Sequence, residues 1–522
     1  MIRALFLLSA LGFAVLGLRT ADHGAVSEAA LRHWASTTRG HHLSPNGLDL
    51  WREFGHTLPL LITQLTHAIP RSGLMGLLVP TAAVSGLIVA WLGWVARQTN
   101  RLRRDDPNSG VATDPSEPLA PVPLAPARME RAGTPLPIWL PALALISAPA
   151  LLHLLTDPSL AVLGLGSLLL CVYFMARIED GDRGARWGLS GAMSLLVLSE
   201  PNALYLLVGT AILLPTALRG VGRYSTRLWN ALRICALPGG TYALVSAGHA
   251  LEQRAPLGSA FALWLEPHHG VVRLDRFHAT EVIAPSIASL PLTLAIVALG
   301  TPLVLVLGLL LSRIRSIRYR VSAVACLLVP LFAVIESHAL GHGATPTFWL
   351  AVTGALTTLW LTLEPLPAGL ARAAFCLVLA LNAGSWVLTR AWSDPEARTW
   401  RVSLTAPVES TYADARVTSR ILGRLDTVVL DEQAAFPLVA LAPRPASLIG
   451  IEAAMQGVAT GAAGFAPEAI VIVNPTLEAG ITDRLHMLMP SLWDEGREGY
   501  EIAIERPGWR VYRRTGGPLT SI

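Results

Sequence analysis

Two acidic residues stand at the ends of long apolar stretches, Asp22 after the first stretch and Asp157 between two later ones. A charge within or beside a membrane span is unfavourable and is therefore a candidate for function. Two converging carboxylates could bind a divalent cation, Mg or Mn, and the phosphate that it neutralises. One of them could also act as a general base on an incoming hydroxyl group. The alternative is that these acids only mark span ends and that Asp157-Pro158 only makes a turn.

Further polar residues are expected on the same face of the membrane as this acidic pair. They are His23, Glu200, Arg254, His268, His269 and Arg273. Imidazole and carboxylate groups can ligate transition metals, and the planar fork of Arg suits phosphate. We therefore predict that these residues bind substrate. The alternative is that the histidines are solvated or interfacial and that the arginines are ordinary loop charges.

The elements that must position these residues are strongly apolar. Of the 522 residues, 52% are hydrophobic and 15% are charged, and the mean hydropathy is +0.50. Soluble domains carry about 25% charged residues, so lipid must be the solvent for most of this chain. The sequence predicts a polytopic α-helical membrane protein with about 11 transmembrane helices. The predicted spans are a first run that ends at Leu18 and then, approximately, 73–96, 136–156, 159–176, 187–199, 202–218, 230–250, 289–312, 321–339, 347–364 and 370–389.

The first run has the charged start and the length of a secretory signal peptide, but its exit at 17–22 lacks a clean small-x-small cleavage site. We therefore predict an uncleaved first span.

Arginine residues indicate the orientation of the spans. All 40 basic residues are Arg, and they cluster in alternate links, at 97–104, 177–186, 219–233 and 313–320. The links around 157–158, 200–201 and 341–343 contain none. Because basic loops stay in the cytoplasm, the N-terminus is predicted inside, and Asp22, Asp157 and Glu200 are predicted outside. The charge is spread over many loops, which does not suggest a nucleic-acid partner.

The chain divides into a membrane domain over 1–390 and an extracytoplasmic α/β domain over 391–522. The membrane domain has predicted outer loops at about 19–72 and 251–288 and a predicted disordered cytoplasmic linker at about 105–135, which is rich in Pro, Ala and acids. The second domain has apparent strands at 427–431, 469–475, 500–504 and 509–512, with helical patterns at about 411–424, 451–459 and 477–489. The four cysteines lie in apolar runs and indicate neither a disulfide framework nor a zinc site.

Three local patterns accompany this layout. The first span leads directly into an outer acid over 16–23, LGLRTADH. An aromatic residue, a glycine and a proline occur in 54–61, FGHTLPLL, shortly before the second span. A further acid opens the fourth span in 156–160, TDPSL. With a C-terminal domain on the outer side, these features resemble the GT-C superfamily of membrane glycosyltransferases, which includes protein O-mannosyltransferases and lipid A aminoarabinose transferases. This chain has Asp22-His23 where that family usually has an acidic pair.

The resemblance implies an inverting glycosyltransferase of the bacterial inner membrane that moves a sugar from a polyprenyl-phosphate donor to an acceptor on the outer face. It implies that Asp22 is the base for the acceptor hydroxyl and that Asp157 helps to hold a metal or the donor phosphate. The alternative is a non-catalytic, GT-C-like subunit whose outer domain recruits membrane protein partners during envelope assembly. A transporter is disfavoured, because no central span carries a convincing buried charge.

Overall fold

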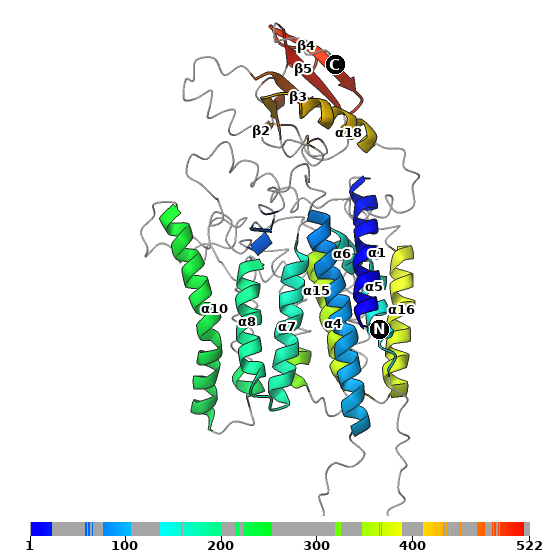
Figure 1. Ribbon diagram of the computed structural model, residues 1–522, viewed down its shortest axis with the longest axis vertical. Coiled ribbons are helices and arrows are strands. Elements are labelled where there is room, and N and C mark those ends of the chain that lie inside the picture. The colour runs from blue at the N-terminus through cyan, green and yellow to red at the C-terminus, as the bar shows by residue number, and fades with distance from the viewer. Residues whose placement is uncertain are drawn as a thin grey trace, which may run out of the picture.

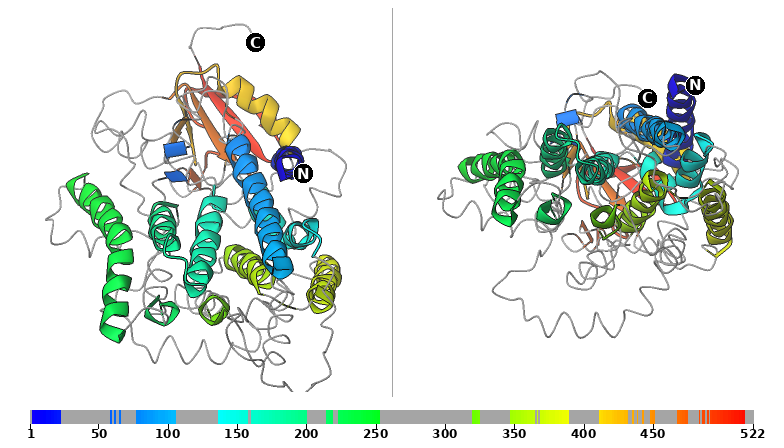
Figure 2. Two further views of the ribbon diagram at one scale, coloured as in Figure 1. Left: turned by 60° about the horizontal axis from the view of Figure 1, so that its bottom comes forward. Right: turned by 90° about the horizontal axis from the view of Figure 1, so that it is seen from below.

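The structure is a computed structural model that describes most of the predicted helices and strands. The described residues are 2–22, 58–59, 61–62, 65, 77–105, 136–157, 160–199, 214–218, 223–252, 319–324, 347–364, 366, 368–388, 411–431, 435, 438, 442, 448–450, 467–474, 483, 485–486, 489 and 491–515. Long helices lie side by side in a bundle, and a β-sheet lies beyond one end of that bundle (Figures 1 and 2).

The bundle has an apolar core and an apolar outer surface. Its described helices are α1 (Ile2–Asp22), α4 (Leu78–Asp105), α5 (Trp139–Ser147), α6 (Pro149–Thr156), α7 (Val162–Glu179), α8 (Ala185–Ser199), α10 (Tyr224–Glu252), α15 (Thr347–Leu363) and α16 (Ala368–Leu388). Buried aliphatic side chains form one continuous cluster between them. Leu7, Leu8 and Leu11 of α1 and Leu228 and Leu232 of α10 are exposed. Exposed aliphatic faces of this kind suit lipid and are unusual in water.

Helices α1 and α4 are antiparallel and in close contact. A β-carbon added to Gly86 would lie 2.8 Å from the β-carbon of Ala10, and one added to Gly93 would lie 2.9 Å from Cδ2 of Leu5. Small residues allow membrane helices to approach in this way. Because these pairs run in opposite directions along the two helices, the end of α1 lies beside the start of α4.

Two described helices are long and apolar enough to cross a membrane by themselves, over Leu78–Asn100 and Val162–Glu179. Shorter apolar helices cover Ile2–Leu18, Gly354–Leu363 and Gly369–Gly384. Several of the predicted spans fall partly or wholly outside the described residues. The number of about eleven spans therefore stays a prediction.

The predicted span over 136–156 is not one continuous helix. Helix α5 ends at Ser147, Ala148 is extended with ψ of 124°, and α6 begins at Pro149. Proline has no N–H and disfavours a helical conformation in the residue before it, so the helix breaks at this point. The predicted span is therefore built from two consecutive helices.

The C-terminal region forms a mixed sheet with one flanking helix. Its elements are α18 (Thr411–Leu422), β1 (Val428–Leu430), β2 (Leu448–Gly450), β3 (Ala469–Val473), β4 (Tyr500–Arg506) and β5 (Trp509–Arg514). The strand order is β2-β1-β3-β5-β4. The pairs of β1 with β2 and with β3 are parallel, and β5 is antiparallel to both β3 and β4.

Apolar side chains cover both faces of the central strands β1 and β3, in two separate clusters. On one face, Leu430 of β1 belongs to an apolar cluster that includes Ala415 and Leu422 of α18. The same cluster contains Leu77, directly before α4, and Leu160, directly before α7. The sheet is therefore joined through apolar contacts to the end of the bundle where α1 ends and α4 and α7 begin.

The strands expected at 427–431 and 469–475 and the hairpin around Pro507-Gly508 are present as β1, β3 and the β4–β5 pair. Strand β2 was missed, because one of its three residues is a glycine, Gly450, which is uncommon within strands. The domain boundary at 390 and the placement of the sheet outside the membrane stay predictions.

Candidate active site

Asp157 lies directly after the last residue of α6 and is almost completely buried, with 4% of its surface exposed. This burial speaks against the view that the acid only marks a span end where water reaches it. The C-terminus of a helix carries partial negative charge from its unpaired carbonyls, and a carboxylate there is unfavourable. Helix capping therefore gives no reason for an acid at this position, and the functional role of Asp157 stays a prediction.

Asp22 occupies the equivalent position on another helix, as the last residue of α1. The backbone of α1 and α6 brings the two helix ends to one side of the bundle, because a β-carbon on Gly17 would lie 3.2 Å from the carbonyl oxygen of Thr156. Asp22 is five residues beyond Gly17, which corresponds to roughly 7 Å along the axis. Two acids at neighbouring helix C-termini are the arrangement that the sequence predicts for this face. The side chain of Asp22 itself lies outside the described part of the structure.

The end of α6 is tied to α4 by a buried hydrogen bond. The hydroxyl of Ser85 donates to the carbonyl oxygen of Leu155 at 2.7 Å. The last carbonyls of a helix have no partner within that helix, so an outside donor is needed where such an end is buried. Ser85 thereby helps to hold the segment that leads into Asp157. This residue was not predicted from the sequence, since one serine in an apolar helix carries no pattern.

The end of α5, directly before the break, is held by a second polar contact. Nδ2 of Asn382, on α16, donates to the carbonyl oxygen of Ala144 at 3.1 Å and to Oγ of Ser147 at 2.7 Å. The N–H of Ala148 turns instead to the carbonyl of Leu145, so the break has freed the carbonyl of Ala144 from its regular helical partner. Asn382 satisfies that carbonyl and joins α16 to the break. This residue was also missed, because its role depends on which helices become neighbours.

The turn after Asp157 contains an unusual backbone conformation. Among the described non-glycine residues, only Leu160 has a left-handed backbone, with φ of 60°. This conformation costs an L-residue roughly 1–2 kcal/mol. The carbonyl of Leu160 accepts the N–H of Leu163 at 2.9 Å, which starts α7. Asp157 thus stands between the end of one helix and a strained entry into the next.

The other six predicted site residues are those expected to bind substrate. His23, Glu200, Arg254, His268, His269 and Arg273 all lie outside the described residues. Their assignment to substrate binding therefore stays a prediction.

A divalent cation needs several oxygen ligands. Within the described residues, no three His, Cys, Asp or Glu side chains come together in a way that could hold a metal ion. Asp157 is the only member of the predicted metal pair whose side chain is described, and one carboxylate is too few to hold such an ion. A Mg or Mn site at Asp22 and Asp157 stays a prediction, and no reaction step is assigned to a metal.

Two further buried acids lie in the C-terminal sheet, where Asp431 directly follows β1. Asp483 accepts the backbone N–H groups of Val473 and Leu485, both at 2.8 Å. Burial raises the pKa of Asp483, the two N–H groups oppose that rise, and the charge of Asp431 adds to it. These bonds connect the end of β3 to Leu485, so we assign Asp483 a structural role.

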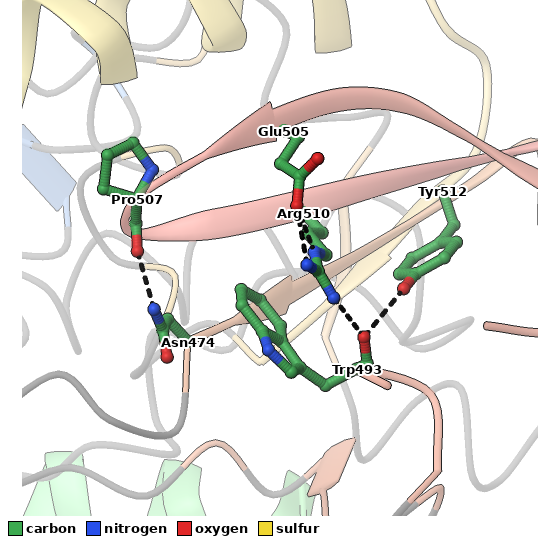
Figure 3. A network of polar contacts seen from close by, with 6 residues as sticks. All are labelled: Asn474, Trp493, Glu505, Pro507, Arg510 and Tyr512. Carbon is green, nitrogen blue, oxygen red and sulfur yellow. Dashed lines mark hydrogen bonds and ion pairs between the residues drawn. The ribbon is translucent and has the colours of Figure 1, made fainter. Parts of the chain in front are cut away.

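A network of polar contacts supports the β4–β5 hairpin (Figure 3). The guanidinium of Arg510 donates to Oε1 of Glu505 and to the carbonyl of Trp493, and it stacks 4.3 Å from the centre of the Trp493 ring. Asn474, after β3, donates to the carbonyl of Pro507 at the hairpin turn. Each of these contacts joins one part of the sheet region to another, so we assign the network to folding of the sheet.

Comparison with known proteins adds one finding. No protein-family model matches this chain, and no curated protein sequence matches it. The fold is similar to the crystal structure of ArnT from Cupriavidus metallidurans bound to undecaprenyl phosphate. The TM-score is 0.54 and the sequence identity 14%, and the alignment covers 99% of each chain. This likeness shows the fold alone: the chain has an ArnT-like architecture, which is the kind of fold that the sequence led us to expect.

Proposed function

We propose that this protein is a membrane glycosyltransferase that moves a sugar from a polyprenyl-phosphate donor to an acceptor on the outer face of the membrane. The observation that carries the proposal is the burial of Asp157 at a helix C-terminus, beside the end of α1 and below the sheet. The ArnT-like fold supports it, because the ArnT structure holds undecaprenyl phosphate. The apolar outer surface of the bundle would also keep a polyprenyl chain in lipid beside the site.

The proposed orientation follows from charge. Arg177, Arg183 and Arg186 lie around the link between α7 and α8, and Arg227 lies in the first turn of α10. The hydroxyl of Ser190, near the start of α8, bonds to the carbonyl of Ile234 at 2.7 Å, so these helix ends are neighbours. They lie at the end of the bundle away from the sheet (Figure 1). Because basic loops stay in the cytoplasm, the opposite end, with Asp157 and the sheet, would face outward.

The proposed reaction is a direct displacement. Asp22 accepts the proton of the acceptor hydroxyl, and that oxygen forms a bond to the anomeric carbon of the sugar. The bond from the anomeric carbon to the phosphate oxygen breaks, and its electron pair leaves with the polyprenyl phosphate. Attack from the side opposite the leaving group inverts the anomeric carbon. We assign Asp157 to the donor side, where a carboxylate would attract the cation that accompanies a phosphate.

Lipid analysis of the purified protein tests the proposal. Wild type and Asp157→Asn are purified in the same mild detergent, and co-purifying lipids are identified by mass spectrometry. We expect a polyprenyl phosphate or its glycoside with the wild type and at least a tenfold reduction in the variant. Asp182→Asn is the matched control, since Asp182 is a half-exposed acid that pairs with Arg177 at the opposite end. Bulk phospholipid alone in all three samples would contradict the transferase and favour the non-catalytic subunit.

A further inference from the structure

Leu160 lies three residues after Asp157, in the turn that leads from α6 into α7. Its left-handed backbone, with φ of 60°, is a conformation that glycine or asparagine adopts with much less strain. A leucine stays in such a conformation only where its surroundings hold it there. Its side chain must therefore have contacts that outweigh the strain.

Leu160 belongs to an apolar cluster that also contains residues of the C-terminal sheet and of α18. Leu160 is fully buried, with 0% of its surface exposed, and its apolar cluster includes Leu422 of α18 and Leu430 of β1. Leu77, directly before α4, belongs to the same cluster. The apolar face of the sheet thus reaches the turn that carries Asp157.

Helix α6 alone does not determine where Asp157 lies. The helix ends at Thr156, whose hydroxyl bonds back to the carbonyl of Leu152 at 2.9 Å. Asp157 is beyond that end, so its backbone conformation depends on the turn into α7. The next described residue is Leu160, whose carbonyl starts α7 through the N–H of Leu163.

We propose that Leu160 is a positioning residue for Asp157. The apolar cluster of the sheet fixes the Leu160 side chain, and this packing maintains the left-handed backbone of Leu160. That backbone in turn determines how the chain leaves α6 and buries Asp157. The C-terminal sheet is then part of the catalytic unit, because it shapes the site as well as covering it. The catalytic meaning of this positioning rests on the function proposed for Asp157.

Three variants of the full chain test this coupling. Leu160→Ala removes the side chain from the cluster. Alanine has the same cost for a left-handed backbone, so nothing then outweighs that strain. Leu492→Ala is the matched control, because it makes the same truncation of a buried leucine in the separate apolar cluster on the other face of the sheet. Leu160→Met keeps the apolar volume and is expected to behave like the wild type.

The first measurement is hydrogen exchange of peptides that cover 150–163, and it requires no activity. We expect at least tenfold faster exchange there in Leu160→Ala, and wild-type exchange in Leu492→Ala and Leu160→Met. Equal exchange in the two alanine variants would mean a general loss of stability and would overturn the coupling. If Leu160→Ala does not fold, Leu77→Ala provides the same comparison from the other side of the cluster.

The second measurement is binding of added undecaprenyl phosphate, followed by native mass spectrometry. We expect binding at least tenfold weaker for Leu160→Ala than for Leu492→Ala, with wild-type affinity for Leu160→Met. Faster exchange without weaker binding would overturn the positioning role. No binding by the wild type would contradict the proposed function instead, and the exchange experiment would still decide whether the sheet holds the turn.

Discussion

Gly17 of α1 and Thr156 of α6 approach so closely that a β-carbon on Gly17 would lie 3.2 Å from the Thr156 carbonyl oxygen. The same β-carbon would lie 3.0 Å from Cδ2 of Leu78 in α4. Three helices therefore meet at one glycine, directly below the two helix ends that carry Asp22 and Asp157. A backbone carbonyl cannot rotate away as a flexible side chain can, so the close approach of α1 to α6 depends on the absence of a side chain at Gly17.

Replacement of Gly17 by Val should separate these helices. Overpacking of this kind typically costs about 1–3 kcal/mol, so we expect a fall in the melting temperature in detergent and a loss of any transfer activity. Gly12→Val is the matched control, since a β-carbon on Gly12 meets nothing within 4 Å. Equal melting temperatures for the two variants would show that the close approach at Gly17 is not limiting.

Replacement of Asn382 by Leu should leave the carbonyl of Ala144 without its amide donor. The Ser147 hydroxyl still donates to this carbonyl at 3.1 Å. We therefore expect a cost of about 1 kcal/mol, the lower end of the range for a lost partner, and a less well held break between α5 and α6. We expect a lower melting temperature and faster hydrogen exchange over 144–150. Thr241→Val is the control, because the exposed Thr241 hydroxyl bonds only within its own helix, to Leu237. Unchanged exchange over 144–150 would argue against a role of Asn382 at the break.

The acid-dependent stability of the protein should report on Asp483. An acid whose pKa is raised binds more protons in the native state than in the unfolded state. Its contribution to the free energy of unfolding is therefore greatest below the ordinary pKa of 3.8 and falls as the pH rises through the raised pKa. The fall is about 1.4 kcal/mol for each pH unit that separates the folded-state pKa from the unfolded-state pKa.

Melting curves of the wild type and Asp483→Asn over a pH series test this expectation. The variant loses hydrogen bonds at every pH, but the difference in melting temperature between wild type and variant should decrease as the pH rises. Asp182→Asn should show the opposite slope, since Arg177 lowers the pKa of the half-exposed Asp182. A gap that is constant for Asp483→Asn would contradict the raised pKa.

The predicted Mg or Mn site can be tested by removing metal. If Asp22 and Asp157 hold a divalent cation, EDTA should abolish sugar transfer, and added Mg or Mn should restore it. Asp157→Asn should raise the metal concentration that restores half of the transfer activity. Asp182→Asn should raise it less. Full transfer in the presence of EDTA would show that the two acids act without a metal.

Several features of this protein could be predicted from local sequence because their cause is local. Apolar run length predicted the helices over Val162–Glu179 and Ala185–Ser199, and a run of buried β-branched residues predicted β3. The acid at the end of an apolar run marked Asp157 as a candidate, since burial of a charge is unfavourable wherever it occurs. Strand β2 was missed, because its sequence Leu-Ile-Gly contains a glycine and does not resemble a typical strand.

The amino-acid sequence by itself determined the apolar spans, the alternating Arg-rich links and the two acids at helix ends, because hydropathy, charge and helix length are properties of neighbouring residues. Only the tertiary structure decided that Gly17 meets Thr156, that Asn382 binds the end of α5 and Ser85 the end of α6, and that Leu160 joins the apolar cluster of the sheet. These contacts join residues far apart in the chain. They depend on which helices become neighbours, and hydrophobic patterning does not specify that choice, since any apolar face can pack against another.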